Sequence, residues 1–167
     1  MKALISAFVL SILFACATPY QRIGTTVAGG YSSTRVATNQ FDVRFLGNGF
    51  TEPRRAYDFA LLRASEVALE HNYPYFVLLG QQDQSKSEIV RGNSTSYTTG
   101  TLNTQGGFGS FNGTTTTYNN DIPVMKPGTA LRIYCMESRD ELGPHAGNVY
   151  DAQQVRSQLR SKYQLDQ

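Results

Sequence analysis

The chain has 167 residues, a length typical of a single domain of about 100–200 residues. Its formal charge is only +2 and 17% of its residues are charged, so it lacks the dense lysine and arginine clusters of nucleic-acid-binding proteins. We therefore expect no nucleic-acid partner. Hydrophobic residues make up 40% of the chain, with ten Tyr and nine Phe, which is enough to build one core.

The first 15 residues have the pattern of an export signal. Lys2 precedes an apolar run over 3–15 that only two serines interrupt, and this run is shorter than the about 20 apolar residues that span a bilayer. The run ends in Leu13-Phe14-Ala15-Cys16, which resembles a bacterial lipobox. The resemblance implies cleavage before Cys16 and lipidation of that cysteine. An ordinary secretory signal followed by an unrelated cysteine is the alternative.

A lipidated Cys16 would anchor the protein to a membrane, because several acyl chains together bind a bilayer stably. Ala17 follows the cysteine, where an Asp would resemble the inner-membrane retention signal. We therefore expect an outer-membrane protein that faces the periplasm, with the outer leaflet of the inner membrane as the alternative. Residues 16–39 are expected to be the lipidated cysteine and a tether, within which 29–32 is a candidate docking segment.

Residues 40–167 are predicted to form a single α+β domain. Aromatic and aliphatic residues alternate with polar ones over 40–46, as in a half-buried strand. A helical pattern follows over 52–71, and a continuous apolar strand follows over 75–81. A strand, a helix and a strand in succession predict a parallel pair of strands joined by a crossover.

The predicted helix has Thr51 as its expected N-cap and one face rich in alanine. The expected packing face comprises Ala56, Tyr57, Ala60, Leu61, Ala64, Val67 and Ala68. Arg63, Glu66 and Glu70 are expected in a solvated stripe on the opposite side. Phe59 falls inside that stripe, so it either covers a loop or marks a contact surface.

Several short motifs resemble those of one family. They are A-T-P-Y-Q after the lipobox, G-G-Y-S at 29–32, F-x-G-N at 45–48 and L-L-R-A-S-E-V-A-L-E at 61–70. Together they resemble an uncharacterised family of bacterial lipoproteins. The resemblance covers Cys16 to Leu79 and implies localisation and domain limits. It implies no activity, cofactor or catalytic residue.

A polar insertion over 85–122 separates the second strand from a third strand at 129–136. Gly92–Asn120 has no charged residue and is rich in Thr, Gly, Asn and Ser. It is either a disordered loop or a hairpin in which 95–101 pairs with 114–120 around Gly106-Gly107, and we expect a poorly ordered hairpin. Its aromatic residues form, with Phe59, a candidate interaction surface: Tyr97, Phe108, Phe111 and Tyr118.

The last part of the chain predicts one strand and one helix. Cys135 lies on the apolar face of the strand at 129–136, where a buried, inert thiol is the expectation. Asp151 is the expected cap of a helix over 152–163. The expected buried stripe of this helix is Ala152, Val155 and Leu159, and its expected solvated cations are Arg156, Arg160 and Lys162.

No enzyme or metal motif stands out in the sequence. His71 and His145 are not at metal-ligand spacing from each other or from Cys135, so we expect no cofactor and no metal. The leading hypothesis is a lipid-anchored envelope protein, not an enzyme, that binds or supports another envelope protein or a wall polymer. A periplasm-facing module for a small ligand is the alternative, and a hydrolase is a remote third.

Overall fold

The computed structural model describes residues 17–25, 29–105, 108–141 and 148–165. The chain divides into two compact units, and each is described by itself. The core unit consists of Met1–Lys86 and Met125–Gln167, and the hairpin unit is Ser87–Val124. The lipobox and Cys16 lie outside the described residues.

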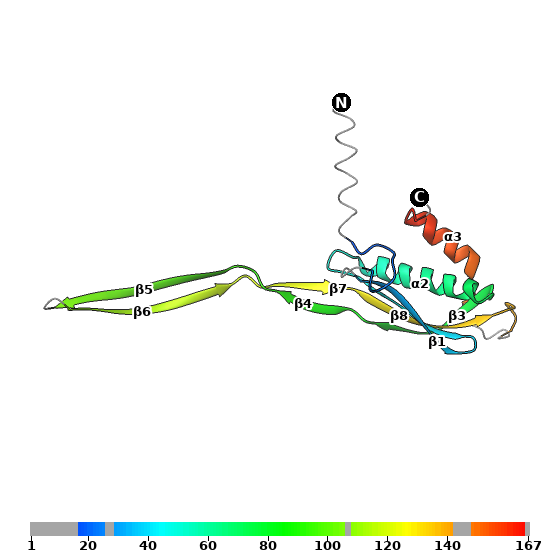
Figure 1. Cartoon of the computed structure of the whole chain (residues 1–167), viewed down its shortest axis with the longest axis horizontal. Helices are drawn as coiled ribbons and strands as arrows, with labels where there is room; N and C mark the ends of the chain where they lie inside the picture. Colours follow the sequence, from blue (N-terminus) through cyan, green and yellow to red (C-terminus); the bar gives the residue numbers. More distant parts are fainter. Residues whose placement is uncertain (1–16, 26–28, 106–107, 142–147, 166–167) are drawn as a thin grey trace, which may run out of the picture. The chain divides into compact units, whose positions relative to one another are not determined.

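The core unit combines a five-stranded antiparallel sheet with two helices, so the predicted α+β fold is confirmed (Figure 1). The strand order is β1-β2-β8-β3-β9. The strands are β1 (Gly30–Ala37), β2 (Gln40–Leu46), β3 (Tyr75–Asp83), β8 (Gly128–Met136) and β9 (Tyr150–Asp151), and the helices are α2 (Pro53–Glu70) and α3 (Ala152–Lys162). Helix α2 packs on the sheet, and α3 packs on α2 (Figure 1).

The predicted parallel pairing of the strands before and after α2 is wrong. Strand β8 lies between β2 and β3 and is antiparallel to both, with Ile133 opposite Phe41 on one side and Leu78 on the other. Strands β2 and β3 therefore run in the same direction without sharing hydrogen bonds. Strand β8 is largely apolar and most of its residues are buried, which fits its position at the centre of the sheet.

Alternation along the strands builds the core. Phe41, Val43 and Phe45 on β2 and Leu131 and Ile133 on β8 are at most 2% exposed and belong to one cluster with the alanines of α2. Small side chains let the helix lie close to the sheet. Each fully buried large apolar side chain contributes about 1.5–3 kcal/mol to folding.

The predicted tether is partly wrong, because the sheet begins inside it. Strand β1 pairs with β2 from Gly30↔Leu46 onward. Gly29 and Gly30 have φ angles of 100° and 138°, and a Cβ at Gly29 would lie 2.2 Å from the carbonyl oxygen of Leu46. Only glycine permits this close approach. The ordered core unit therefore starts well before residue 40, and Thr18 is already fully buried.

The ends of α2 match the prediction only in part. Glu52, not Thr51, is the N-cap residue, and it makes no side-chain capping bond, while Pro53 occupies the first turn. Thr51 Oγ1 instead accepts hydrogen bonds from the backbone N–H groups of Thr18 (3.1 Å) and Asn48 (3.2 Å). The helix ends at Glu70, close to the predicted end at residue 71, and Asn72 just beyond it adopts φ 63°.

The predicted packing face of α2 is confirmed for Ala56, Ala60, Ala64, Val67 and Ala68, but the rest of this helix is not simply solvated as predicted. Its buried residues include Asp58, Phe59, Leu62 and Ser65 as well as the alanines. The sheet covers one side of α2, and α3 and the segment around Tyr20 cover a second side. The charged side of this helix is therefore an internal interface.

The hairpin unit consists almost entirely of paired strands. Strand β5 (Ser94–Gln105) is antiparallel to β6 (Phe108–Asn119), in register from Ser94↔Asn119 to Gln105↔Phe108. At its base, β4 (Lys86–Val90) pairs with β7 (Ile122–Lys126). The hairpin alternative for the polar insertion is thus confirmed over the disordered loop.

Candidate functional site

Phe59, a predicted contact residue, is a core residue. Its side chain is fully buried, and its ring meets those of Phe45, Tyr20 and Tyr163 edge to face, with centroid distances of 5.0, 5.3 and 4.8 Å. These partners come from β2, from the N-terminal segment and from the end of α3. Helical periodicity places Phe59 on the side of α2 that carries the charged residues. That side packs against α3, so a large apolar side chain is buried there.

The predicted aromatic residues of the insertion lie on two different faces of the hairpin. Tyr97 and Tyr118 share one face, with ring centroids 6.2 Å apart and exposed fractions of 62% and 60%. Phe111 lies on the opposite face, opposite Leu102. The side chain of Phe108 is outside the described part of the structure. Tyr97 and Tyr118 are therefore the pair that forms one exposed aromatic surface.

The Phe111 face has a well-defined packing of its own. The Phe111 ring covers the Gly100–Gly113 pair, since a Cβ on either glycine would lie 2.5 Å from a ring atom. On the same face, the hydroxyl groups of Ser96 and Thr117 and of Thr98 and Thr115 are hydrogen-bonded across the strands, at 2.9 and 2.8 Å. Cross-strand contacts, not a core, hold this ribbon together.

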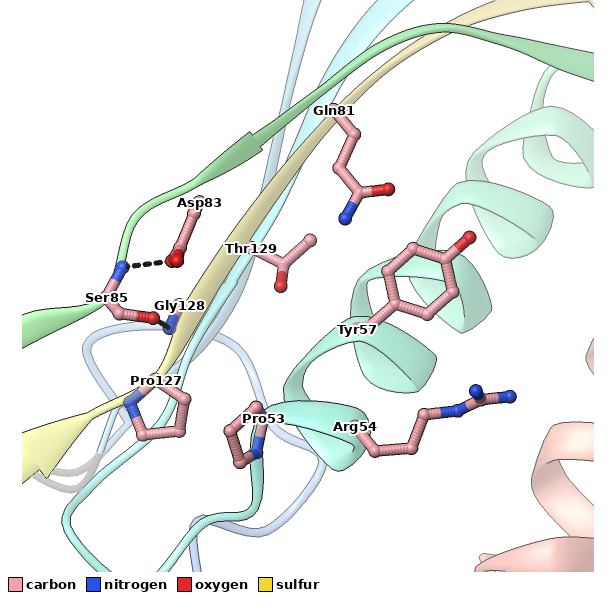
Figure 2. A pocket seen from close by; sticks show the side chains of 9 residues that line it. All are labelled: Pro53, Arg54, Tyr57, Gln81, Asp83, Ser85, Pro127, Gly128 and Thr129. Carbon is pink, nitrogen blue, oxygen red and sulfur yellow. Dashed lines mark hydrogen bonds between the residues drawn. The ribbon is translucent and has the colours of Figure 1, made fainter.

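An open groove of about 520 Å³ lies in the core unit between the start of α2 and the ends of β3 and β8 (Figure 2). Figure 2 shows Gln81 and Thr129 on the strands facing Tyr57 on the helix. The register shift between Leu78 and Gly80 aligns Gln81 with Leu131, on the helix side of the sheet. The complete lining is Pro53, Arg54, Tyr57, Gln81, Asp83, Ser85, Pro127, Gly128 and Thr129.

The polar groups of this groove have local partners. The Asp83 carboxylate accepts a hydrogen bond from the Ser85 backbone N–H at 2.8 Å, and the side chain and backbone of Ser85 lower the pKa of Asp83. Burial, and then the neighbouring Tyr150 hydroxyl, raises the pKa of Tyr57. Gln81 and Thr129 add further hydrogen-bonding groups to the lining.

A second groove, of about 530 Å³, lies on the open face of the sheet. Arg132 donates to both carboxylate oxygens of Asp42, at 2.7 and 2.8 Å, and this bond lowers the pKa of Asp42. Arg44 donates to the Ser32 hydroxyl at 2.7 Å. Asp42 and Arg132 therefore neutralise each other across the strands, and Arg44 is bonded to a neutral hydroxyl group.

Two carboxylates on α2 take part in ion-pair networks: Asp58 is buried, and Glu66, which we expected in solvent, has a half-buried side chain. Asp58 is 3% exposed and accepts from Lys162 Nζ (2.6 Å), the Tyr163 hydroxyl (2.8 Å) and Arg54 Nε (3.1 Å). Three donors from α2 and the end of α3 surround this carboxylate. Their arrangement holds the C-terminal helix on α2.

Glu66 forms the second network. It accepts a hydrogen bond from the Tyr20 hydroxyl at 2.5 Å, and Arg63 and Arg160 lie 3.4 and 3.3 Å from its oxygens. Burial, and then the hydrogen bond to Glu66, raises the pKa of Tyr20. The predicted solvated placement is therefore wrong for Glu66 and Arg160, whose side chains are 14% and 24% exposed. Lys162 is exposed as predicted, and its ammonium group bonds to Asp58.

Cys135 and His71 belong to residue types that often act in catalysis, but here each packs within the core unit. Cys135 is fully buried, and this burial raises the pKa of its thiol to about 12. His71 Nδ1 lies 2.9 Å from the carbonyl oxygen of Val67, and its ring packs on Phe41. Neither residue lines the groove of Figure 2. His145 lies outside the described residues.

Within the described ranges, no group of three His, Cys, Asp or Glu side chains could hold a metal ion. No helix in that part of the chain is long and apolar enough to cross a membrane. No family model, no curated protein and no solved structure matches this chain. The function of this chain must therefore be inferred from its own residues and their geometry.

Proposed function

We propose that this chain is a lipid-anchored protein of the bacterial cell envelope and that it works by binding through its hairpin unit. The lipobox-like sequence Leu13–Cys16 supports acylation of Cys16, and Ala17 favours the outer membrane with the protein facing the periplasm. The partner is another envelope protein or a wall polymer. The resemblance to bacterial lipoproteins supports the same localisation.

The exposure of the hairpin is the observation that carries the binding role. Every residue from Ser87 to Pro123 whose side-chain burial is described is exposed, and none from Gly92 to Asn120 is charged. A two-stranded ribbon without a core is only marginally stable in water. Residues that bury nothing within the chain are available to bury surface against a partner.

The edges of the ribbon suit the addition of a strand. Among the described strands, β5 and β6 pair only with each other, so each has one edge without a neighbouring strand. An exposed edge accepts an extended segment through backbone hydrogen bonds. Natural edges are usually blocked by lysine or proline, and neither occurs in β5 or β6.

The Tyr97–Tyr118 face suits an uncharged partner. Both rings are exposed and lie among threonines, so this face offers apolar ring surface together with hydroxyl groups. Tyrosine rings combine apolar area with a hydrogen-bonding group, and this combination is common at interfaces. An uncharged polymer or protein strand would meet no electrostatic barrier at this face.

The groove of Figure 2 favours a second candidate, a module for a small polar ligand. Its volume falls within the about 300–1,000 Å³ range of ligand pockets, although its lining is more polar than is usual for them. Amide chemical shifts at Gln81 and Ser85, followed during titration with amino acids and sugars, test this candidate. Shifts that Tyr57→Phe weakens would support it, and unchanged shifts would count against it.

Photocrosslinking in cells tests the binding role of the hairpin. A photoreactive side chain placed at Tyr97 is expected to give one defined adduct, and the same side chain at Val36 is expected to give none. Val36 is a matched control because it is apolar and 51% exposed but lies in the core unit. Equal adducts at both positions, or none at Tyr97 and Tyr118, would contradict the proposal.

Membrane fractionation tests the anchor separately. Cys16→Ala is expected to move the protein from the membrane fraction to the soluble fraction, because the acyl chains provide the attachment. The crosslinking of the hairpin is measured on the anchored protein. Tight membrane association of the Cys16→Ala variant would show that something other than lipidation holds it.

A further inference from the structure

The segment directly after Cys16 is built into the core unit. Thr18 is fully buried, its backbone N–H donates to Thr51 Oγ1 at 3.1 Å, and its Oγ1 accepts from the backbone N–H of Asn48 at 2.8 Å. Both bonds go to the loop between β2 and α2. Thr18 is therefore attached to that loop through its backbone and its side chain.

The next residues continue this attachment. The ring of Tyr20 lies 4.7 Å from that of Tyr31 and 5.3 Å from that of Phe59, and its hydroxyl donates to Glu66. The backbone N–H of Tyr31 donates to the carbonyl of Gln21 at 2.7 Å. Thr18, Tyr20 and Gln21 are therefore part of the folded unit and add no length to a spacer between it and Cys16.

The position of Thr18 limits how far the core unit can stand from the membrane. Only Ala17 lies between Cys16 and Thr18, and two residues span at most about 7 Å. A lipid on Cys16 therefore keeps the loop that binds Thr18 beside the bilayer. That loop is Gly47–Thr51, and only the exposed Glu52 lies between it and α2.

The same loop presents an apolar side chain to solvent. Phe50 is 73% exposed, the largest exposed fraction among the large hydrophobic residues described. Its backbone N–H donates to Asn48 Oδ1 at 3.0 Å, which fixes the turn that exposes the ring. No residue in Ala17–Gln21 or Leu46–Thr51 is charged, so insertion among lipid headgroups would bury no charge there.

We infer that the core unit docks directly on the phospholipid surface through the loop Gly47–Thr51, with Phe50 inserted at the boundary of headgroups and acyl chains. This inference rests on the proposed lipid anchor at Cys16. Phe50 acts as a second membrane contact beside the acyl chains and fixes which side of the core unit faces the bilayer.

The absence of tryptophan allows a direct test. Phe50→Trp and Val36→Trp each introduce a unique fluorophore at an exposed apolar position. Gly30 pairs with Leu46, so this end of β1 lies beside the loop that carries Phe50. Val36 lies six residues further along β1, which places it about 20 Å from that loop. Each acylated full-length variant is incorporated into phosphatidylcholine vesicles with brominated acyl chains, which quench only nearby tryptophan.

The fluorescence of the Phe50→Trp variant is expected to be quenched by at least about twofold, because its side chain would lie at the bilayer boundary. The fluorescence of the Val36→Trp variant is expected to stay unchanged, because its side chain would lie in water. Equal emission changes in the two variants, or no quenching of the Phe50→Trp variant, would overturn the docking. The mass of Cys16 and flotation of the vesicles report the anchor independently. A chain without acyl groups would overturn the proposed anchor itself, and the docking with it.

Discussion

Phe50 and Phe59 show how differently two similar residues are used near the start of α2. Phe59 is fully buried among aromatic rings, whereas Phe50 is 73% exposed on the loop before the helix. Local sequence does not distinguish them, because both stand next to polar or small residues. Phe59 is covered by Tyr20 and Tyr163, which are far from it in the chain.

Phe59→Ala is expected to lower the free energy of unfolding of the core unit by about 3–5 kcal/mol, because it leaves a cavity among three aromatic rings. Denaturant unfolding of the segment Ala17–Gln167 measures the loss. Phe50→Ala is the matched control and should change the value by less than about 0.5 kcal/mol. Similar losses for both variants would contradict the burial of Phe59.

Cys135 should make the stability of the core unit depend on pH in the alkaline range. Burial raises the pKa of its thiol from 9.0 to about 12. Between these values, the unfolded chain releases a proton that the folded chain retains, so the free energy of unfolding falls as the pH rises. Cys135→Ala should show a shallower decline between pH 9 and pH 11. Parallel curves for the two proteins would count against a protonated, buried thiol.

At the scale of elements, α3 and the N-terminal segment complete the burial of α2. Lys162 and Tyr163 bond to Asp58, and Tyr20 and Arg160 contact Glu66. The helical periodicity of α2 correctly predicted a helix but assumed one buried side. A helix covered on two sides has polar groups in both environments, and periodicity alone does not separate them.

The cap of α3 gives a prediction for this element. Asp151 Oδ1 accepts a hydrogen bond from the Gln154 backbone N–H at 2.8 Å, as the sequence predicts. Asp151→Ala is expected to cost about 0.5–2 kcal/mol of stability, because it leaves a helix N–H group without its partner. Gln153→Ala, at an exposed helical position, is the control. An equal effect of the two changes in denaturant unfolding would contradict the role of the cap.

The register of the hairpin could have been predicted more fully from the sequence. A two-residue turn at Gly106-Gly107 pairs Gln105 with Phe108, and counting back from there places Phe111 opposite Leu102. This count alone separates Phe111 from Tyr97 and Tyr118, which lie on the other face. By the same count Phe108 lies on the face of Tyr97 and Tyr118, so the sequence limits the candidate surface of the hairpin to these three positions.

At the scale of the whole molecule, the two units differ in what stabilises them. The core unit has a buried aromatic and aliphatic cluster, whereas the hairpin unit relies on cross-strand hydrogen bonds and surface contacts. The chain leaves and re-enters the core unit at neighbouring points, because Gln84 N donates to Gly128 O at 2.9 Å. The core unit therefore does not need the hairpin to close its sheet.

Replacement of Ser87–Val124 by an Asn-Gly turn is expected to leave the core unit folded, with its free energy of unfolding changed by less than about 1 kcal/mol. Circular dichroism and denaturant unfolding measure this. The shortened protein should keep the membrane attachment that we propose for Cys16 and lose the proposed crosslinked adduct. Unfolding of the shortened chain would show that the hairpin contributes to the core.

The sequence by itself determined the main helices, three central strands, the hairpin and the buried face that holds Cys135, because periodicity and turn residues are local signals. Only the tertiary structure decided that β8 lies between β2 and β3, that Phe59 is buried and that Thr18 is attached to Thr51. Each of these features depends on contacts between segments far apart in the chain. Local periodicity contains no information on which distant segment will cover a given face, so packing alone settles it.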